Sequence, residues 1–349
     1  MKLLEIKNLS AKIGGFSLTG INFSVQKGET FVIVGENGAG KTKLLDAISG
    51  FLPLESGRII LNGEDITHLP PQRRKMGYIF QTLALFPHLT VRQNVLYGAR
   101  FKEVSQERFE KIVNLFRIGH LLDRKPAELS GGEKQKVALA RTLILQPLVV
   151  LLDEPTSALS EREKERVDLE IKAIFKEIRQ TAIFVTHSVR EAYLVGDRVG
   201  VMENGGLVQT GTHEEIVRNP KNVSVAAAFG EVNVINGTVE SCRNGVCIAL
   251  FDGGFVYFLG QKKTGDKVKL IVRPEDILIK IRASKTSARN NFKGTVSDIS
   301  FVGPLVRIRA DCGADFIVYI TRQSFEELNI KKGKTVVLSF KITSARPVD

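Results

Sequence analysis

Residues 35–42 constrain the fold of this chain more than any other segment. They read GENGAGKT and fit the pattern G-x-x-x-x-G-K-[ST]. The apolar run 31–34 before them predicts a buried strand, and 41–49, followed by Gly50, predicts a helix. Glycines between a strand and a helix let backbone N–H groups turn inward, and the helix start adds the positive end of its dipole. This loop is therefore suited to hold phosphate groups.

Each residue of the loop is a candidate nucleotide ligand. Lys41 is expected to neutralise the β- and γ-phosphates, and Thr42 to offer its hydroxyl to Mg²⁺. The predicted ATP-binding residues here are Gly35, Glu36, Asn37, Gly38, Ala39, Gly40, Lys41 and Thr42.

Two carboxylates follow the apolar run 148–152. An acidic strand end is on its own usually a turn, but a phosphate-binding loop upstream makes it a predicted hydrolysis site. Asp153 is placed to hold Mg²⁺ through water, and Glu154 to polarise the attacking water.

A second phosphate-binding element is predicted at Ser130, Gly131 and Gly132, which precede the amphipathic stretch 134–145. Two distant helix ends of one subunit cannot easily cradle one γ-phosphate. We therefore expect a head-to-tail homodimer, in which each ATP lies between one chain's Lys41 loop and the other chain's Ser130. A plain helix cap is the alternative.

The predicted secondary structure changes near Gly230. Residues 1–230 alternate strands and helices, which predicts an α/β domain with a largely parallel sheet and a helical subdomain at about 83–146. Within the subdomain Thr90 is a plausible helix cap, and Phe109, Ile112, Val113 and Phe116 recur at helical spacing. Residues 231–349 read as short strands separated by turns, which predicts an all-β, barrel-like second domain.

Charge and cysteine content narrow the class of protein. The formal net charge is +12, and residues 232–349 carry 19 Lys and Arg against 11 Asp and Glu, which fits a soluble surface or an anionic partner. Three cysteines without a CxxC pair favour a reducing compartment over disulfides. No run approaches the about 20 apolar residues of a membrane helix, and the N-terminus resembles no signal peptide. We predict a cytoplasmic protein.

Two further residues complete an ordered set of motifs. Gln81 ends a predicted strand, and His187 follows the strand 182–186. With the loop at 35–42, Ser130 and Glu154, the chain resembles the ATP-binding cassette (ABC) family. That resemblance implies that Gln81, Glu154 and His187 are catalytic, with Gln81 also coupling to a membrane partner. It implies that Thr42, Gln81 and Asp153 bind Mg²⁺.

Two positions depart from the family pattern. The family usually stacks an aromatic residue of the first hairpin on adenine, whereas Ile13 occupies the matching position here, with Phe16 as the alternative. The loop after Glu154 ends in Ser160, where the family typically has Asp.

A single cassette followed by a basic β domain resembles importer ATPases. Residues 286–290, TSARN, resemble the oxyanion-binding motif of molybdate- and tungstate-binding β-barrels, and Lys341 matches the lysine near the end of those modules. The resemblance makes Ser287, Arg289 and Lys341 candidate oxyanion ligands. A structural turn is the alternative. The resemblance implies a molybdate or tungstate importer ATPase, peripheral at the cytoplasmic face of the membrane. Its partners would be two permease subunits, an external substrate-binding protein and a regulatory oxyanion.

Other substrates and another class of function stay open. Sulfate, iron, sugar or polyamine importers would use the same cassette. A non-transport ATPase acting on nucleic acid is the remaining alternative, although no helix-turn-helix, zinc-finger or RNP-type signature supports a nucleic-acid partner.

Overall fold

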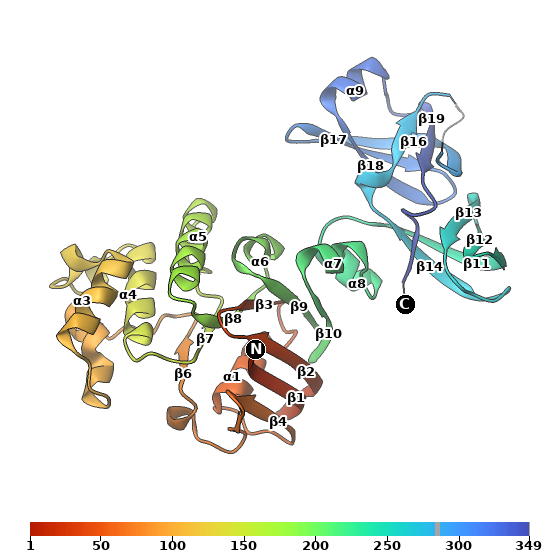
Figure 1. Ribbon diagram of the computed structural model, residues 1–349. Coiled ribbons are helices and arrows are strands. Elements are labelled where there is room, and N and C mark those ends of the chain that lie inside the picture. The colour runs from red at the N-terminus through yellow and green to blue at the C-terminus, as the bar shows by residue number, and fades with distance from the viewer. Residues whose placement is uncertain (283–286, 349) are drawn as a thin grey trace. The chain divides into compact units, whose positions relative to one another are not determined.

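The chain forms two compact units, Met1–Glu214 and Glu215–Asp349 (Figure 1). A computed structural model of the protein describes residues 1–282 and 287–348. The division falls inside helix α7 (His213–Arg218), whereas the sequence analysis placed the domain boundary at residue 230. No helix of the described residues is long and apolar enough to span a membrane.

The first unit is built on a six-stranded sheet of order β10-β9-β3-β8-β7-β6. All neighbours are parallel except the edge pair β10–β9. The strands are β3 (Thr30–Val34), β6 (Met76–Ile79), β7 (Val149–Asp153), β8 (Thr181–Thr186), β9 (Arg198–Glu203) and β10 (Gly206–Gly211). Every residue of β3, β7 and β8 is buried, which confirms the three core strands predicted from the apolar runs.

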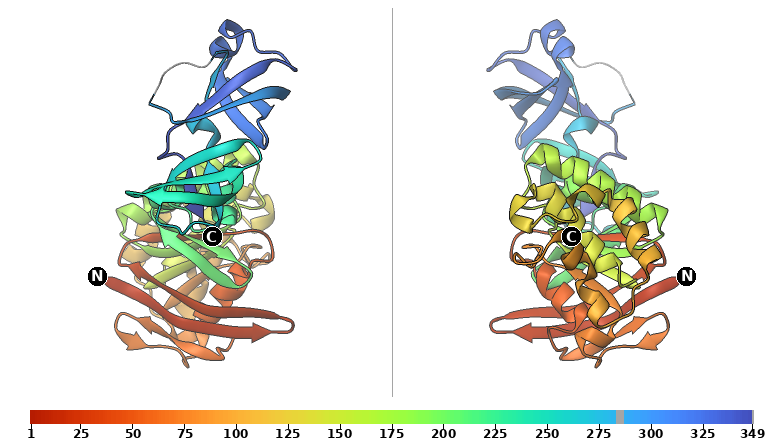
Figure 2. Two further views of the ribbon diagram at one scale, coloured as in Figure 1. Left: turned by 90° about the vertical axis from the view of Figure 1, so that its right-hand side faces the viewer. Right: turned by 90° about the vertical axis from the view of Figure 1, so that its left-hand side faces the viewer.

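A second sheet is antiparallel, with order β2-β1-β4-β5. Its strands are β1 (Lys2–Ile13), β2 (Phe16–Gln26), β4 (Ser56–Leu61) and β5 (Glu64–Asp65), and β1 and β2 form a long antiparallel hairpin, drawn in red in Figure 2. Helix α1 (Lys41–Ser49) buries Leu44, Leu45 and Ile48 in one core with apolar residues of both sheets. That packing fixes the start of α1 at the end of β3.

Helices lie between β6 and β9 along the chain. They are α2 (Val91–Val95), α3 (Gln106–Phe116), α4 (Gly131–Leu143), α5 (Glu161–Glu177) and α6 (Val189–Val195), with short 3-10 turns at Pro71–Arg73, Leu96–Arg100, Gly119–Leu121 and Pro126–Glu128. Thr90 caps α2 as predicted, in a capping box with Gln93. The predicted apolar face of α3 is buried at Phe109, Ile112, Val113 and Phe116. A helical region therefore lies between Gln81 and β7.

The second unit contains two five-stranded antiparallel sheets, of order β13-β12-β11-β14-β20 and β15-β19-β16-β17-β18. Buried side chains of both sheets share one core. The strands are β11 (Asn233–Arg243), β12 (Val246–Phe251), β13 (Gly254–Leu259), β14 (Lys267–Val272), β15 (Leu278–Lys280), β16 (Asn290–Val302), β17 (Leu305–Asp311), β18 (Asp315–Thr321), β19 (Thr335–Phe340) and β20 (Arg346–Val348). The second unit also contains the C-terminal part of α7, α8 (Val223–Ala228), α9 (Arg322–Glu327) and a turn at Pro274–Asp276.

The cysteine prediction was wrong. Cys242 and Cys247 form a disulfide, with Cα atoms 4.0 Å apart, because they face each other directly across the β11–β12 hairpin. Counting cysteines and searching for CxxC could not reveal this pairing, which depends on hairpin register. Cys312 stays a free thiol, and burial raises its pKa to about 12.

Candidate nucleotide site

The loop between β3 and α1 has the backbone that the sequence pattern requires. Gly40 caps α1 with a φ of 103°, in the left-handed region that favours glycine. A Cβ atom at Gly40 would lie 2.7 Å from the ring of Phe16, and one at Gly35 would lie 2.3 Å from the carbonyl oxygen of Met202. Side chains at these two positions would therefore displace either the loop or its neighbours.

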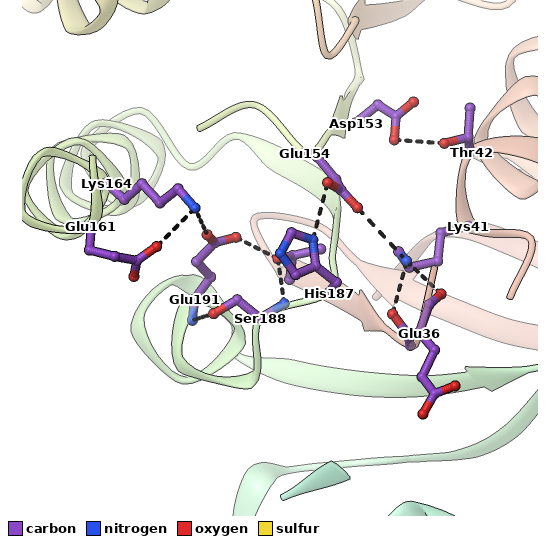
Figure 3. Close-up of polar contacts among 12 residues, drawn as sticks. Glu36, Lys41, Thr42, Asp153, Glu154, Glu161, Lys164, His187, Ser188 and Glu191 are labelled. Carbon is purple, nitrogen blue, oxygen red and sulfur yellow. Dashed lines mark hydrogen bonds and ion pairs between the residues drawn. The ribbon is translucent and has the colours of Figure 1, made fainter. Parts of the chain in front are cut away.

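Lys41 points back into the loop that precedes it. Its Nζ donates hydrogen bonds to the carbonyl oxygens of Gly35, at 2.9 Å, and Glu36, at 3.0 Å (Figure 3). The same atom lies 3.8 Å from Oε1 of Glu154, and the Lys41 side chain is only 6% exposed. Burial lowers the pKa of Lys41, while Glu154 and Asp153 oppose that shift. A buried positive charge is thus held against the phosphate loop.

Thr42 and Asp153 bring two oxygen ligands together. The Thr42 hydroxyl donates to Oδ1 of Asp153 at 3.0 Å. Burial raises the pKa of Asp153, and the hydrogen bond from Thr42 opposes this. A hydroxyl and a carboxylate are the hard oxygen donors that Mg²⁺ prefers, so these residues fit a magnesium site completed by phosphate oxygens and water.

Glu154 lies between Lys41 and His187. Its Oε2 is 3.1 Å from Nδ1 of His187, while its Oε1 faces Lys41 (Figure 3). The backbone of Glu154 has a φ of 42°, and its N–H donates to the carbonyl of Val185 on β8. A left-handed backbone at a non-glycine residue is held here by that bond between neighbouring strands. The carboxylate is thereby fixed next to both a cation and an imidazole.

A cavity of about 520 Å³ opens over these groups. Its lining residues are Phe16, Asn37, Gly38, Gly40, Lys41, Thr42, Lys43, Gln81 and Glu154. The structure therefore brings Gln81 to the loop as the motif order implied. Ile13, predicted to contact adenine, is not among the lining residues and is 40% exposed at the end of β1. Phe16, at the start of β2, is the aromatic side chain of this cavity.

The predicted second phosphate element lies outside this cavity. Ser130 caps α4, and its hydroxyl donates to Oε2 of Glu133 at 2.8 Å. The hydrogen bonds from Ser130 lower the pKa of Glu133. Neither Ser130 nor the following Gly131 and Gly132 line the cavity around Lys41. Within one chain, the two phosphate-binding elements are therefore not brought together.

Ser160 is also engaged within its own chain. It caps α5 in a capping box, and its hydroxyl donates to Oε2 of Glu163 at 2.6 Å. The hydroxyl proton is thus committed locally, although the oxygen can still accept a hydrogen bond from outside.

Two charged residues beside the site were not predicted. Lys43 lines the cavity, and its Nζ lies 3.7 Å from Oδ2 of Asp46, one turn along α1. Glu191 lies four residues after His187, and its carboxylate accepts a hydrogen bond from the hydroxyl of Thr186, the residue before His187. Helical spacing after His187 was the sequence signal for Glu191, but only packing shows where its carboxylate points.

The candidate oxyanion ligands of the second unit are all exposed. Asn290 pairs with Phe340 in the antiparallel β16–β19 ladder, so Arg289 and Lys341 are neighbours just beyond the ladder. Arg289 lies over the ring of Tyr257, 5.7 Å from its centre, and Asn290 bonds the Tyr257 backbone through both its side-chain atoms. Thr286 of the predicted motif lies outside the described residues.

Comparison with known proteins agrees with this geometry. Residues 18–157 match the family model described as ABC transporter, and residues 270–347 match the model described as TOBE domain. The molybdate/tungstate import ATP-binding protein of Pyrococcus abyssi is 42% identical over 99% of both chains. The spermidine/putrescine import ATP-binding protein of Oleidesulfovibrio alaskensis is 35% identical over 93% of this chain and 91% of its own.

A solved structure shares the fold of the first unit. The ADP conformation of MJ1267, an ATP-binding cassette of an ABC transporter, matches with a TM-score of 0.57 and 27% identity. The match covers 65% of this chain and 99% of that chain. Fold, site and relatives agree that this chain belongs to the ABC transporter family, as one of its ATP-binding proteins.

Proposed function

We propose that this chain is the ATP-hydrolysing subunit of an importer for molybdate and tungstate. The observation that carries hydrolysis is the placement of Glu154 between Lys41 and His187, on a cavity lined by the phosphate loop. The substrate rests on the name and full-length similarity of the Pyrococcus abyssi relative, and the polyamine relative is less similar.

Glu154 is the proposed general base. Its carboxylate is held but partly exposed, so a water in the cavity can donate to it and be polarised for attack on the γ-phosphorus. Lys41 is placed to stabilise charge on the transferred phosphoryl group, and His187 to orient Glu154 and contact the γ-phosphate. Thr42, Asp153 and Gln81 would hold Mg²⁺, which supplies charge neutralisation for the β- and γ-phosphates.

A homodimer is proposed because one chain has half of a phosphate site. The Lys41 loop contacts a nucleotide from one side, and the Ser130 helix start that would close the other side is absent from its cavity. The Ser130 of a second copy can meet this need if the two chains face head to tail. The nucleotide then becomes part of the dimer interface.

Phe16 is proposed to hold the base in place of Ile13. Its ring lies in the cavity and packs on the loop at Gly40, next to the phosphate site. Aromatic rings stack on any nucleobase, because every base has a π-face. The base is therefore held with little selectivity between purines.

A membrane subunit is proposed to dock in an aromatic groove beside Gln81. The groove has a volume of about 480 Å³ and is lined by Tyr78, Phe80, Phe86, Tyr97 and Phe101 among others. Arg141 of α4 holds the 83–84 segment through hydrogen bonds of 2.8 and 2.9 Å to its carbonyls. An apolar helix of the permease fits such a groove. Because α4 begins next to Ser130 and carries Arg141 in its last turn, docking is coupled to the phosphate element.

The second unit is proposed to bind the oxyanion as a regulatory ligand. Arg289 and Lys341 are adjacent cations, and neither forms an ion pair with a described residue. Two adjacent cations repel each other until an anion lies between them, and a guanidinium offers a fork of donors to an oxyanion. Ser287 can add a hydroxyl.

Glu154→Gln should abolish turnover and preserve ATP binding. The amide cannot accept the proton from water, so we expect kcat to fall about 100-fold or more. The variant should form a dimer at saturating Mg-ATP, as seen by light scattering after gel filtration. Glu177→Gln, an exposed carboxylate at the end of α5, is the control and should behave as wild type. A strictly monomeric Glu154→Gln protein would contradict the composite site.

Phe16→Ala should weaken ATP binding about ten-fold, because the stacking contact is lost. Ile13→Ala should change it less than two-fold. Phe16→Leu retains an apolar contact with Gly40 but cannot stack, and should resemble Phe16→Ala. Equilibrium binding of ATP and GTP to the three variants measures this, and the reverse ranking of positions 13 and 16 would rule out the assignment.

Proteoliposomes holding the chain with its own permease and binding protein should accumulate tungstate when ATP is supplied on the cassette side. Molybdate should compete, while sulfate and spermidine in hundred-fold excess should not. Phe101→Glu should abolish uptake and permease co-purification, with ATPase activity of the isolated chain within two-fold of wild type. Phe255→Glu, an exposed phenylalanine of the second unit, is the control. Competition by spermidine alone would assign the chain to polyamine import.

Tungstate should bind the full chain saturably, and Arg289→Gln or Lys341→Gln should weaken binding at least ten-fold. Lys331→Gln removes an exposed lysine elsewhere in the second unit and should leave binding unchanged. Equilibrium dialysis measures the affinity, and ATPase inhibition by tungstate should weaken in parallel. An absence of saturable binding at millimolar tungstate would refute the regulatory site without affecting the proposed ATPase activity.

A further inference from the structure

Glu191 ties together the two residues that flank His187. Its Oε2 accepts a hydrogen bond from the buried hydroxyl of Thr186, and its backbone N–H donates to Oγ of Ser188. The Ser188 backbone N–H donates in turn to the Thr186 hydroxyl at 2.9 Å. These three bonds close a ring around the loop from which the imidazole projects toward Glu154 (Figure 3).

The same carboxylate faces helix α5. Nζ of Lys164 lies 4.0 Å from Oε1 of Glu191 and 3.1 Å from Oε1 of Glu161, as Figure 3 shows. Glu161 is 80% exposed, whereas Lys164 and Glu191 are 13% and 9% exposed. Lys164 thus has its shorter contact with the exposed Glu161, and Glu191 is the buried carboxylate that it faces.

Asp168, one turn further along α5, adds a second buried carboxyl. It is fully buried, and its Oδ1 accepts from the Thr156 hydroxyl at 3.3 Å. Its Oδ2 has no hydrogen-bond partner among the described residues. Thr156 lies two residues after Glu154, so α5 contacts the segment of the proposed base on one side and the His187 loop on the other.

These charges do not balance if both carboxyls are ionised. Asp168 is faced by Glu191 from α6 and by Lys164 and Glu161 of its own helix. Burial raises the pKa of Asp168 to about 7, with Glu191 adding to the shift and Thr156 and Lys164 opposing it. A neutral Asp168 leaves one buried carboxylate opposite one buried ammonium.

We propose that Glu191 is a positioning residue for His187, and that Asp168 supports it by holding a proton that keeps the buried charges balanced. The inference rests on the proposed ATPase function and adds a control on the same site. Glu191 fixes the loop on both sides of His187, and His187 contacts Glu154 at 3.1 Å. Removing the carboxyl group of Glu191 or Asp168 is therefore expected to change the orientation of the general base Glu154 and to leave nucleotide binding intact.

The sign of the pH dependence follows from the charge balance. Below about pH 7 Asp168 is neutral, and Glu191 is attracted to Lys164 without opposition. Above that pH a second negative charge forms in the same buried cluster and repels Glu191. The hold on Thr186 weakens, so kcat should fall as pH rises through about 7.

A double-mutant cycle on the full chain tests the positioning role. At saturating Mg-ATP, Glu191→Gln should lower kcat at least ten-fold, with KM for ATP within two-fold, because the Lys41 loop is untouched. In a His187→Ala background the same substitution should lower kcat less than two-fold. An equal loss in both backgrounds, or a matching rise in KM, would overturn the proposal.

Two further comparisons separate positioning from folding. Thr186→Val removes the hydroxyl that donates to Glu191 and accepts from the Ser188 N–H, and should reproduce the loss of kcat, while Thr186→Ser keeps the hydroxyl and should retain the activity. Glu165→Gln removes a carboxylate that also bridges α5 and α6, through Arg190, but at the surface. Its kcat and pH profile should match wild type. Full activity in Thr186→Val would contradict the role of Glu191.

Asp168→Asn tests the shared proton. Asparagine is the same size and stays neutral, so the fall in kcat above about pH 7 should disappear while activity at pH 6 is retained. An unchanged fall above pH 7 in Asp168→Asn would refute the role of Asp168. A wild-type chain without ATPase activity would instead refute the proposed function, so the two failures are distinguishable.

Discussion

The adjacency of three parallel strands underlies everything else in the first unit. Strand β8 pairs with β3 on one side and β7 on the other, in register. The carboxyl ends of parallel strands meet at one edge of a sheet, so Lys41, Glu154 and His187 converge although they are far apart in sequence. The N–H of Glu154, bonded to Val185, couples β7 to β8 at that edge. The positions of the charged groups at the site therefore depend on the pairing of these three strands.

In the partly buried nucleotide site, a positive charge is balanced by neighbouring carboxylates. Lys41 faces the carboxylates of Asp153 and Glu154, and the loop carbonyls satisfy its remaining donors. Phosphate groups entering the cavity would compete for the same ammonium, which would free Glu154 for water. Behind the site, Lys164 faces the carboxyls of Glu191 and Asp168. The proposed chemistry and its proposed control thus use one principle, a buried cation shared between two acids.

The two units differ in how much their sequences revealed. In the first, the phosphate loop, the acidic strand end and the helix caps at Thr90 and Ser130 lie within short segments, so local patterns were sufficient. In the second, alternation of apolar residues predicted strands but not their partners. The neighbouring positions of Arg289 and Lys341 depend on the Asn290–Phe340 register, and the Cys242–Cys247 disulfide on a hairpin register. Neither register is visible in composition or in motif spacing.

The sequence by itself determined the chemistry of this protein, because phosphate binding requires particular residues at short spacing on a strand, a loop and a helix. The order of motifs also determined the family. Only the tertiary structure decided which side chains meet. It placed Phe16 and not Ile13 in the cavity, and it set Asp168 against Glu191 across two helices. The reason is physical: contacts between distant segments are set by packing of the whole core, which no local pattern encodes.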